Sequence, residues 1–115
     1  MICFKNRVFR SVENTANGEV SSHTTFRYEQ EGRIIHATYE GGDILYGTLV
    51  GTIDEKSCLT FRYQHVNKAY EIRGGTCFST PEVLPDGRIR LHEEWQWLDT
   101  DETKGQSIIE ELVHK

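Results

Sequence analysis

The chain has 115 residues, of which 37% are hydrophobic and 27% are charged, and its formal net charge is -5. This composition is typical of a soluble folded chain with one core, so we expect a single domain over residues 1–115 and exclude an extended disordered protein. Lys and Arg are scattered singly instead of forming a basic patch, which argues against nucleic-acid binding. Residues 1–14 hold no long apolar run, so we expect neither a secretory signal nor a membrane span there.

Turn-forming residues recur at short intervals along the chain. The first signal is Asn17-Gly18, a dipeptide typical of tight hairpins because both of its residues accept positive φ. The signals that follow are Gly32 and the segments 40–43, 54–57, 84–88 and 99–105. They separate eight candidate strands, at residues 2–13, 18–31, 33–41, 43–54, 58–67, 69–80, 88–99 and 106–114. Short strands at such regular spacing are typical of an all-β protein.

Within these segments apolar side chains alternate with polar ones, as expected for strands with one buried face. The segment 33–41 places Ile35, Ala37 and Tyr39 on one face. The last segment also has Ile and Leu at helical spacing, so it is readable as a helix. We favour a closing strand, because an open meander leaves an exposed edge that a final strand would cover.

Eight antiparallel strands joined in order by short turns predict an up-and-down β-barrel of the lipocalin or streptavidin type. Closure of the barrel removes the exposed edges, and eight strands leave room for packed side chains or for one small ligand. The alternative is a two-sheet β-sandwich made from the same strands. The hairpin-length connections favour the barrel.

The segment 88–99 carries the least expected feature, a carboxylate on an aromatic face. Leu91, Glu93, Trp95 and Trp97 share that face. A buried carboxylate needs hydrogen-bond partners or a ligand, so either Glu93 contributes to a pocket or it lies at the rim or beside a bulge. In the first case, the predicted ligand-binding residues are Tyr28, Tyr39, Tyr63, Glu93, Trp95 and Trp97.

Other chemistry-bearing residues form no recognisable site. The five histidines show no metal-ligand spacing, although His23, His36 and His92 could cluster on the polar outer face. His65 is expected near the end of an inner face. The pair Gly74-Gly75 suggests a bulge or bend. We therefore predict no catalytic residue, no metal and no cofactor.

The cysteine count bears on the compartment in which the protein works. Cys3, Cys58 and Cys77 are an odd number without C-x-x-C spacing. This pattern fits the reducing cytoplasm better than a disulfide framework, so we expect a cytoplasmic protein.

The motifs Y-x-G-G, G-x-L-x-G, G-x-C, G-R-I-R-L-H-E and W-Q-W run through nearly the whole chain. In them the sequence resembles a family of small bacterial proteins commonly labelled N-acetylglutamate synthase. That label implies acetyl-coenzyme A binding, yet no glycine here opens the phosphate-binding loop of the common acetyltransferases. We carry over no catalytic residue. The barrel itself resembles, by analogy of fold, the lipocalin or avidin-like group of ligand-binding barrels.

The sequence is compatible with three functions. The favoured one is binding of a small apolar or aromatic metabolite inside the barrel without catalysis. The second is the acetyltransferase that the label implies. The third is a filled barrel acting as a homodimeric interaction module, for which Ile44, Tyr46 and Val50 would form the exposed patch.

Overall fold

The computed structural model describes residues 2–99 and 102–113. His114, the last of the histidines considered above, lies outside these residues. The described chain forms strands only, in the order β1 (Arg7–Asn14), β2 (Thr25–Glu31), β3 (Ile34–Gly41), β4 (Ile44–Ile53), β5 (Leu59–Asn67), β6 (Ile72–Val83), β7 (Ile89–Trp97) and β8 (Lys104–Glu111).

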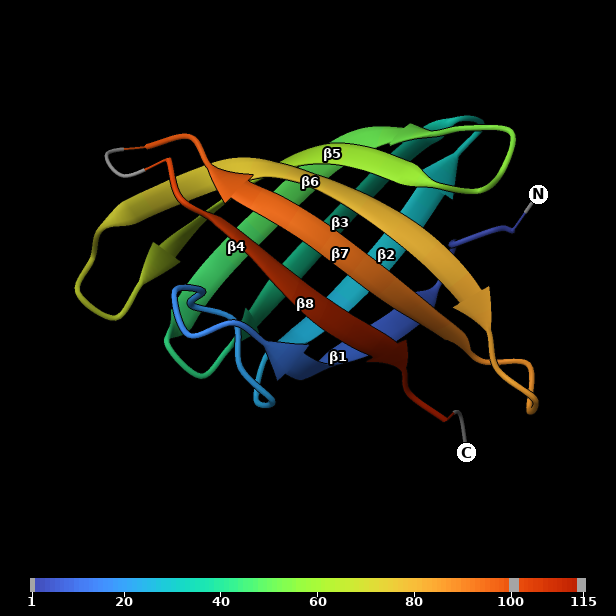
Figure 1. Cartoon of the computed structure of the whole chain (residues 1–115), viewed down its shortest axis with the longest axis horizontal. Coiled ribbons are helices and arrows are strands. Elements are labelled where there is room, and N and C mark those ends of the chain that lie inside the picture. The colour runs from blue at the N-terminus through green and yellow to red at the C-terminus, as the bar shows by residue number, and fades with distance from the viewer. Residues whose placement is uncertain (1, 100–101, 114–115) are drawn as a thin grey trace.

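Each strand pairs antiparallel with the next, and β1 also pairs with β8, so the sheet closes into a barrel (Figure 1). The predicted up-and-down barrel is confirmed, and the sandwich alternative is wrong. The C-terminal segment is a strand, as favoured, because β8 supplies the seam between β7 and β1. No helix suited to crossing a lipid bilayer occurs in the part of the chain described.

Alternation along the strands places one face of each inside the barrel. In β3, Ile35, Ala37 and Tyr39 are buried while the residues between them are exposed. In β7, Leu91, Glu93 and Trp97 are buried, and both neighbouring strands pair with β7 in unbroken register past Glu93. Glu93 therefore points inward, and the rim and bulge readings of this residue are wrong.

Three local expectations need correction. The strand predicted over 18–31 begins only at Thr25, because the polar residues 15–24 form a long loop. Ile44 is buried, since a register shift between Ile44 and Tyr46 reverses the alternation at the start of β4. Of the two predictions for Gly74-Gly75, the bulge is wrong, because β5 and β6 pair there in regular register, while the bend stays a prediction.

Glycines in β4 and β6 allow aromatic rings to lie against bare backbone. A Cβ added at Gly47 would lie well inside contact distance of the Tyr39 ring, and one added at Gly75 would lie 2.5 Å from the hydroxyl of Tyr63 and closer still to the backbone carbonyl oxygen of Gln96. Atoms that close would overlap, so a side chain at either position would displace the ring. These glycines thus set the positions of two aromatic side chains inside the barrel.

Candidate ligand-binding site

The barrel interior is filled at one end. Phe4, which precedes β1, is fully buried against Phe9 and Tyr28, with ring centroids 6.2 and 6.0 Å away. Phe9 and Tyr28 meet edge to face at 5.0 Å. Such aromatic contacts pack this half of the core densely. Any space for a ligand must therefore lie toward the opposite end, where the β1–β2 loop is found.

A cavity of about 50 Å³ occupies that opposite half of the interior. Its wall is largely aromatic and apolar, and the few polar groups come from inward positions of the strands and from the β1–β2 loop. The lining residues are Asn14, Gly18, Glu19, Val20, Phe26, Tyr39, Leu49, Phe61, Tyr63, His65, Cys77, Glu93, Trp95, Trp97 and Ser107. Mostly apolar walls with a few polar groups are typical of small-molecule sites.

Five of the six residues predicted for a pocket meet at this cavity, namely Tyr39, Tyr63, Glu93, Trp95 and Trp97. Tyr28 lies deeper, within the aromatic packing beside Phe9. Its hydroxyl is buried and has no hydrogen-bond partner among the described residues. Whether the five contact a ligand stays a prediction.

Glu93 is the buried carboxylate of this cavity. Its side chain accepts hydrogen bonds from the hydroxyls of Ser79 (3.1 Å) and Ser107 (2.8 Å). These two serines are the residues directly opposite Glu93 on β6 and β8. In the described chain no Lys or Arg forms an ion pair with it, and burial raises the pKa of Glu93 to about 7. At neutral pH the group is thus balanced between its acid and its carboxylate.

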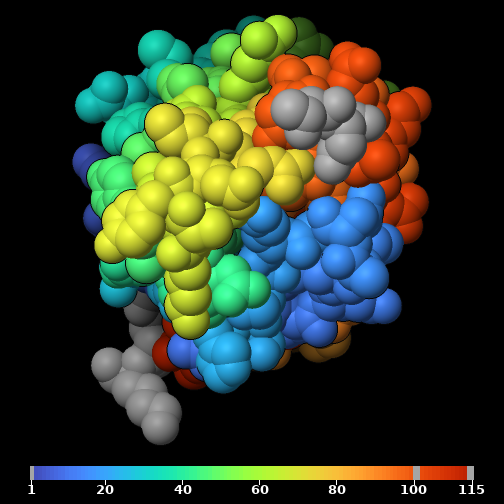
Figure 2. Space-filling view, turned by 90° about the vertical axis from the view of Figure 1, so that its left-hand side faces the viewer, coloured from blue at the N-terminus to red at the C-terminus, as the bar shows by residue number. Residues whose placement is uncertain are grey.

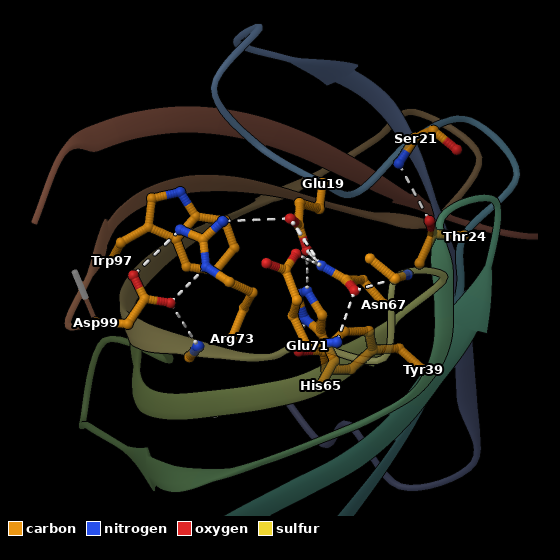
Figure 3. A network of polar contacts seen from close by, with 12 residues as sticks. Glu19, Ser21, Thr24, Tyr39, His65, Asn67, Glu71, Arg73, Trp97 and Asp99 are labelled. Carbon is orange, nitrogen blue, oxygen red and sulfur yellow. Dashed lines mark hydrogen bonds and ion pairs between the residues drawn. The ribbon is translucent and has the colours of Figure 1, made fainter. Parts of the chain in front are cut away.

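A second polar group lies where the cavity meets the β1–β2 loop (Figure 3). His65 contacts the hydroxyl of Tyr39 through Nδ1 (2.9 Å) and the carboxylate of Glu19 through Nε2 (2.8 Å). Burial lowers the pKa of His65, so the neutral ring is favoured. An ionised carboxylate only accepts, which assigns the proton to Nε2 and makes Nδ1 the acceptor for the Tyr39 hydroxyl.

Arg73 forms an ion pair with the second oxygen of the Glu19 carboxylate. Its Nη1 donates to Glu19 Oε2 at 3.2 Å, while Nε and Nη2 donate to Asp99 at 2.5 and 3.1 Å. The guanidinium also stacks on the Trp97 ring, 4.1 Å from its centroid. Asn67 adds contacts of 3.3 and 3.2 Å to the two oxygens of Glu19. Side chains from β5 and β6 thus converge on one loop carboxylate, and Trp97 and Asp99 contact the Arg73 guanidinium.

The β1–β2 loop, residues 15–24, covers this end of the barrel (Figure 2, in blue). The indole N–H of Trp97 donates to the carbonyl of Asn17, and the Asn17 side chain donates to the carbonyl of Lys104. At the far end of the loop, the Thr24 hydroxyl donates to the carbonyl of Gly41. The loop is therefore fastened to the β7–β8 side and to the β3–β4 turn.

Sequence reasoning placed His65 correctly but missed Glu19, Asn67, Arg73 and Asp99. The last three lie at strand ends, where alternation no longer separates inside from outside. Glu19 was assigned to a strand. The polar run from residue 14 to residue 24 was the available signal, because it lacks the apolar alternation that a half-buried strand needs.

The geometry limits the chemistry available at this site. Burial raises the pKa of Tyr39 and of Cys77, so neither group is activated as a nucleophile despite the neighbouring His65 and Glu93. Across residues 2–99 and 102–113, no group of three or more His, Cys, Asp or Glu side chains could hold a metal ion. The arrangement is suited to hydrogen bonding and apolar contact.

These features define a class: a closed eight-stranded antiparallel barrel, packed at one end, with an aromatic-walled cavity under a loop at the other. The comparison with family models agrees with this class. The model of the family described as "Avidin-like protein" matches residues 2–112, and the chain belongs to this family. No curated protein and no solved structure matches the chain, so the resemblance to proteins labelled N-acetylglutamate synthase gains no support from these comparisons.

Proposed function

We propose that the protein binds a small apolar or aromatic metabolite in the barrel cavity, without converting it chemically. The observation that carries the proposal is an aromatic-walled cavity with a buried carboxyl group, Glu93, whose only protein donors in the described chain are neutral side chains. A carboxyl group without a cation inside a protein is costly. A ligand with an N–H, O–H or ammonium group would favour its ionised form.

The cavity is too small for such a ligand, so it must enlarge when the ligand enters. A volume of about 50 Å³ is far below the roughly 300–1,000 Å³ of sites for drug-sized ligands. The strands are joined around the barrel by backbone pairing, whereas the contacts that hold the β1–β2 loop mostly involve a side chain. We therefore place the entry at this loop, whose displacement would enlarge the cavity.

The cavity residues divide into apolar walls and orienting groups. Tyr39, Tyr63, Trp95 and Trp97 would contact the apolar or aromatic body of the ligand, since large rings supply contact area at little entropic cost. Glu93 would accept a hydrogen bond from the ligand's donor. These are the residues predicted from the sequence, without Tyr28.

The test is a titration of small metabolites read by tryptophan emission and by melting temperature. Biotin belongs in the panel because of the relation to avidin, and acetyl-coenzyme A with glutamate tests the enzyme label. A bound ligand should quench emission and raise the melting temperature. Trp95→Phe should weaken both effects while remaining folded, and Tyr46→Phe, on the exposed outer face, should leave them unchanged. A Trp95→Phe protein that binds as tightly as the parent would remove the site from this cavity.

The outer face of the barrel supports a second, separate proposal, that of a homodimer. Tyr46 and Val50 on β4 and Ile34 on β3 are more than half exposed. Large apolar side chains on neighbouring strands are typical of contact surfaces. Proteins of the avidin-like family also often form oligomers. Light scattering that gives the mass of one chain at all concentrations would contradict it.

The cysteines bear on the proposed cytoplasmic location. Cys3, Cys58 and Cys77 are all free, and Cys77 lies in the cavity wall. A reducing compartment would preserve these thiols.

A further inference from the structure

The Glu19 carboxylate lies in a set of N–H donors that resembles a binding site for a free carboxylate. Oε1 faces His65 Nε2 at 2.8 Å and Asn67 Nδ2 at 3.3 Å, and Oε2 faces Asn67 Nδ2 and Arg73 Nη1, both at 3.2 Å. We call His65, Asn67 and Arg73 the cradle. The cradle residues belong to the barrel strands, whereas Glu19 belongs to the loop that covers the cavity (Figure 3).

The charges around the cradle select a monoanion. Arg73 supplies the one formal positive charge of the cradle, and it also pairs with Asp99. His65 is favoured in its neutral form, Asn67 is uncharged, and the carboxylate of Glu71 lies 3.1 Å from Asn67 Nδ2. A dianion such as phosphate would meet repulsion from Asp99 and Glu71, whereas a carboxylate carries the same charge as Glu19.

The cradle is also more stable with an anionic occupant. With the loop in place, His65 and Asn67 are only 3% and 6% exposed, so Glu19 rather than water satisfies His65 Nε2. If the loop opened and nothing replaced Glu19, His65 Nε2 would exchange a carboxylate acceptor for water, while Asn67 and Arg73 would retain Glu71 and Asp99, so the charge-assisted hydrogen bonds to Glu19 would be lost, which is costly. A ligand that supplies its own carboxylate removes that cost.

His65 and Glu19 both line the cavity, as do Tyr39 and Trp97. The cradle is therefore continuous with the aromatic wall, and a molecule in the cavity could reach it with an end group. We infer that the cradle binds the carboxylate of a small apolar or aromatic carboxylic acid, and that Glu19 is a tethered stand-in which this ligand displaces as the loop opens. The inference rests on the proposed function and names its ligand class.

The test separates the cradle from the cavity by chemical rescue. Glu19→Ala empties the cradle. Acetate should raise the melting temperature of this variant by several times more than that of the parent protein, whereas acetamide and inorganic phosphate should not. Glu55→Ala makes the same change of charge in an exposed turn at the other end of the barrel and should show no rescue. Equal effects of acetate and acetamide on Glu19→Ala would overturn the inference.

Phenylacetate and phenylacetamide then probe the cradle and the cavity together. Glu19→Ala should bind phenylacetate about tenfold or more tightly than the parent does, because the tethered competitor is gone, and phenylacetamide should gain much less. If Glu19→Ala does not fold, Glu19→Gln, which keeps an acceptor in place, should show the same preference for phenylacetate more weakly.

The two proposals fail in different ways. Equal affinity for acid and amide in every variant would overturn the cradle and leave the cavity intact. Acetate rescue with no additional gain from the phenyl group would retain the cradle and contradict the aromatic cavity. Absence of any response to all four organic probes would overturn both.

Discussion

Replacement of Glu93 by Gln tests whether a buried carboxyl group controls the pH dependence of stability. Burial raises the pKa of Glu93 from 4.5 to about 7 in the folded protein. Between these values the folded state retains a proton that the unfolded state releases, so the free energy of unfolding falls as pH rises and levels off above about pH 7. The loss is about 3 kcal/mol, from about 1.4 kcal/mol per pH unit over about 2.5 units.

The assay is urea unfolding of the parent and of Glu93→Gln at intervals from pH 5 to pH 8. Gln keeps the shape of the side chain and can bond both serines, accepting from one hydroxyl and donating to the other, but it cannot ionise. Its stability relative to the parent should therefore rise with pH, by about 2–3 kcal/mol over this range. Glu94→Gln, which alters the exposed neighbour, should follow the parent curve.

His65 titrates in the same region with the opposite sign. Its pKa is lowered by burial, so the unfolded state takes up more protons and stability rises with pH below about pH 6.5. The contribution of His65 is present in both proteins and cancels in the difference between them. A difference curve that is flat from pH 5 to pH 8 would refute the reasoning, because it would mean that Glu93 ionises in the folded protein as easily as in the unfolded one.

Three further predictions concern the barrel interior. Tyr28→Phe removes a buried hydroxyl without a partner in the described chain, so urea unfolding should show unchanged stability or a gain of up to about 1 kcal/mol; a loss above that amount would reveal a missed partner. Gly47→Ala adds a Cβ that would overlap the Tyr39 ring, so the free energy of unfolding should fall by about 2 kcal/mol or more. Gly32→Ala, at a positive φ in open space, should lower it by about 1 kcal/mol, and the reverse order would contradict the packing argument. Iodoacetamide should label exposed Cys3 while Cys77, whose pKa is raised by burial, reacts at least tenfold more slowly, as followed by mass spectrometry; equal labelling rates would mean that the cavity is open to solvent.

Much of the barrel could be predicted from the sequence because strand structure has a fixed period. A strand alternates its faces residue by residue, so apolar alternation in segments such as 33–41 identifies both the element and its buried side. Short turns between successive segments then favour neighbours in sequence as neighbours in the sheet. The inward direction of Glu93 and of Trp97 follows from the same rule.

Where the alternation of strand faces is interrupted, the sequence predicts the structure less well. The register shift at Ile44 reverses the faces at the start of β4, and the apolar character of the residues around it does not reveal that shift. The pair Gly74-Gly75 suggested a bulge or bend. In the structure Gly75 leaves room for the Tyr63 side chain of the neighbouring strand β5, and the local sequence does not show which strand lies alongside. In both places the outcome depends on a partner strand, which local sequence does not specify.

The amino-acid sequence by itself determined the all-β class, the order of the strands and the inward direction of Tyr28, Tyr39 and Trp97, because alternation and turn chemistry are local properties. Only the tertiary structure decided that one end is packed by Phe4 and that the other is covered by a loop whose Glu19 meets His65 and Arg73. These last contacts join residues 46 and 54 positions apart. Loop residues carry no periodic signal, so their partners become defined only when the closed barrel brings its strand ends together beneath them.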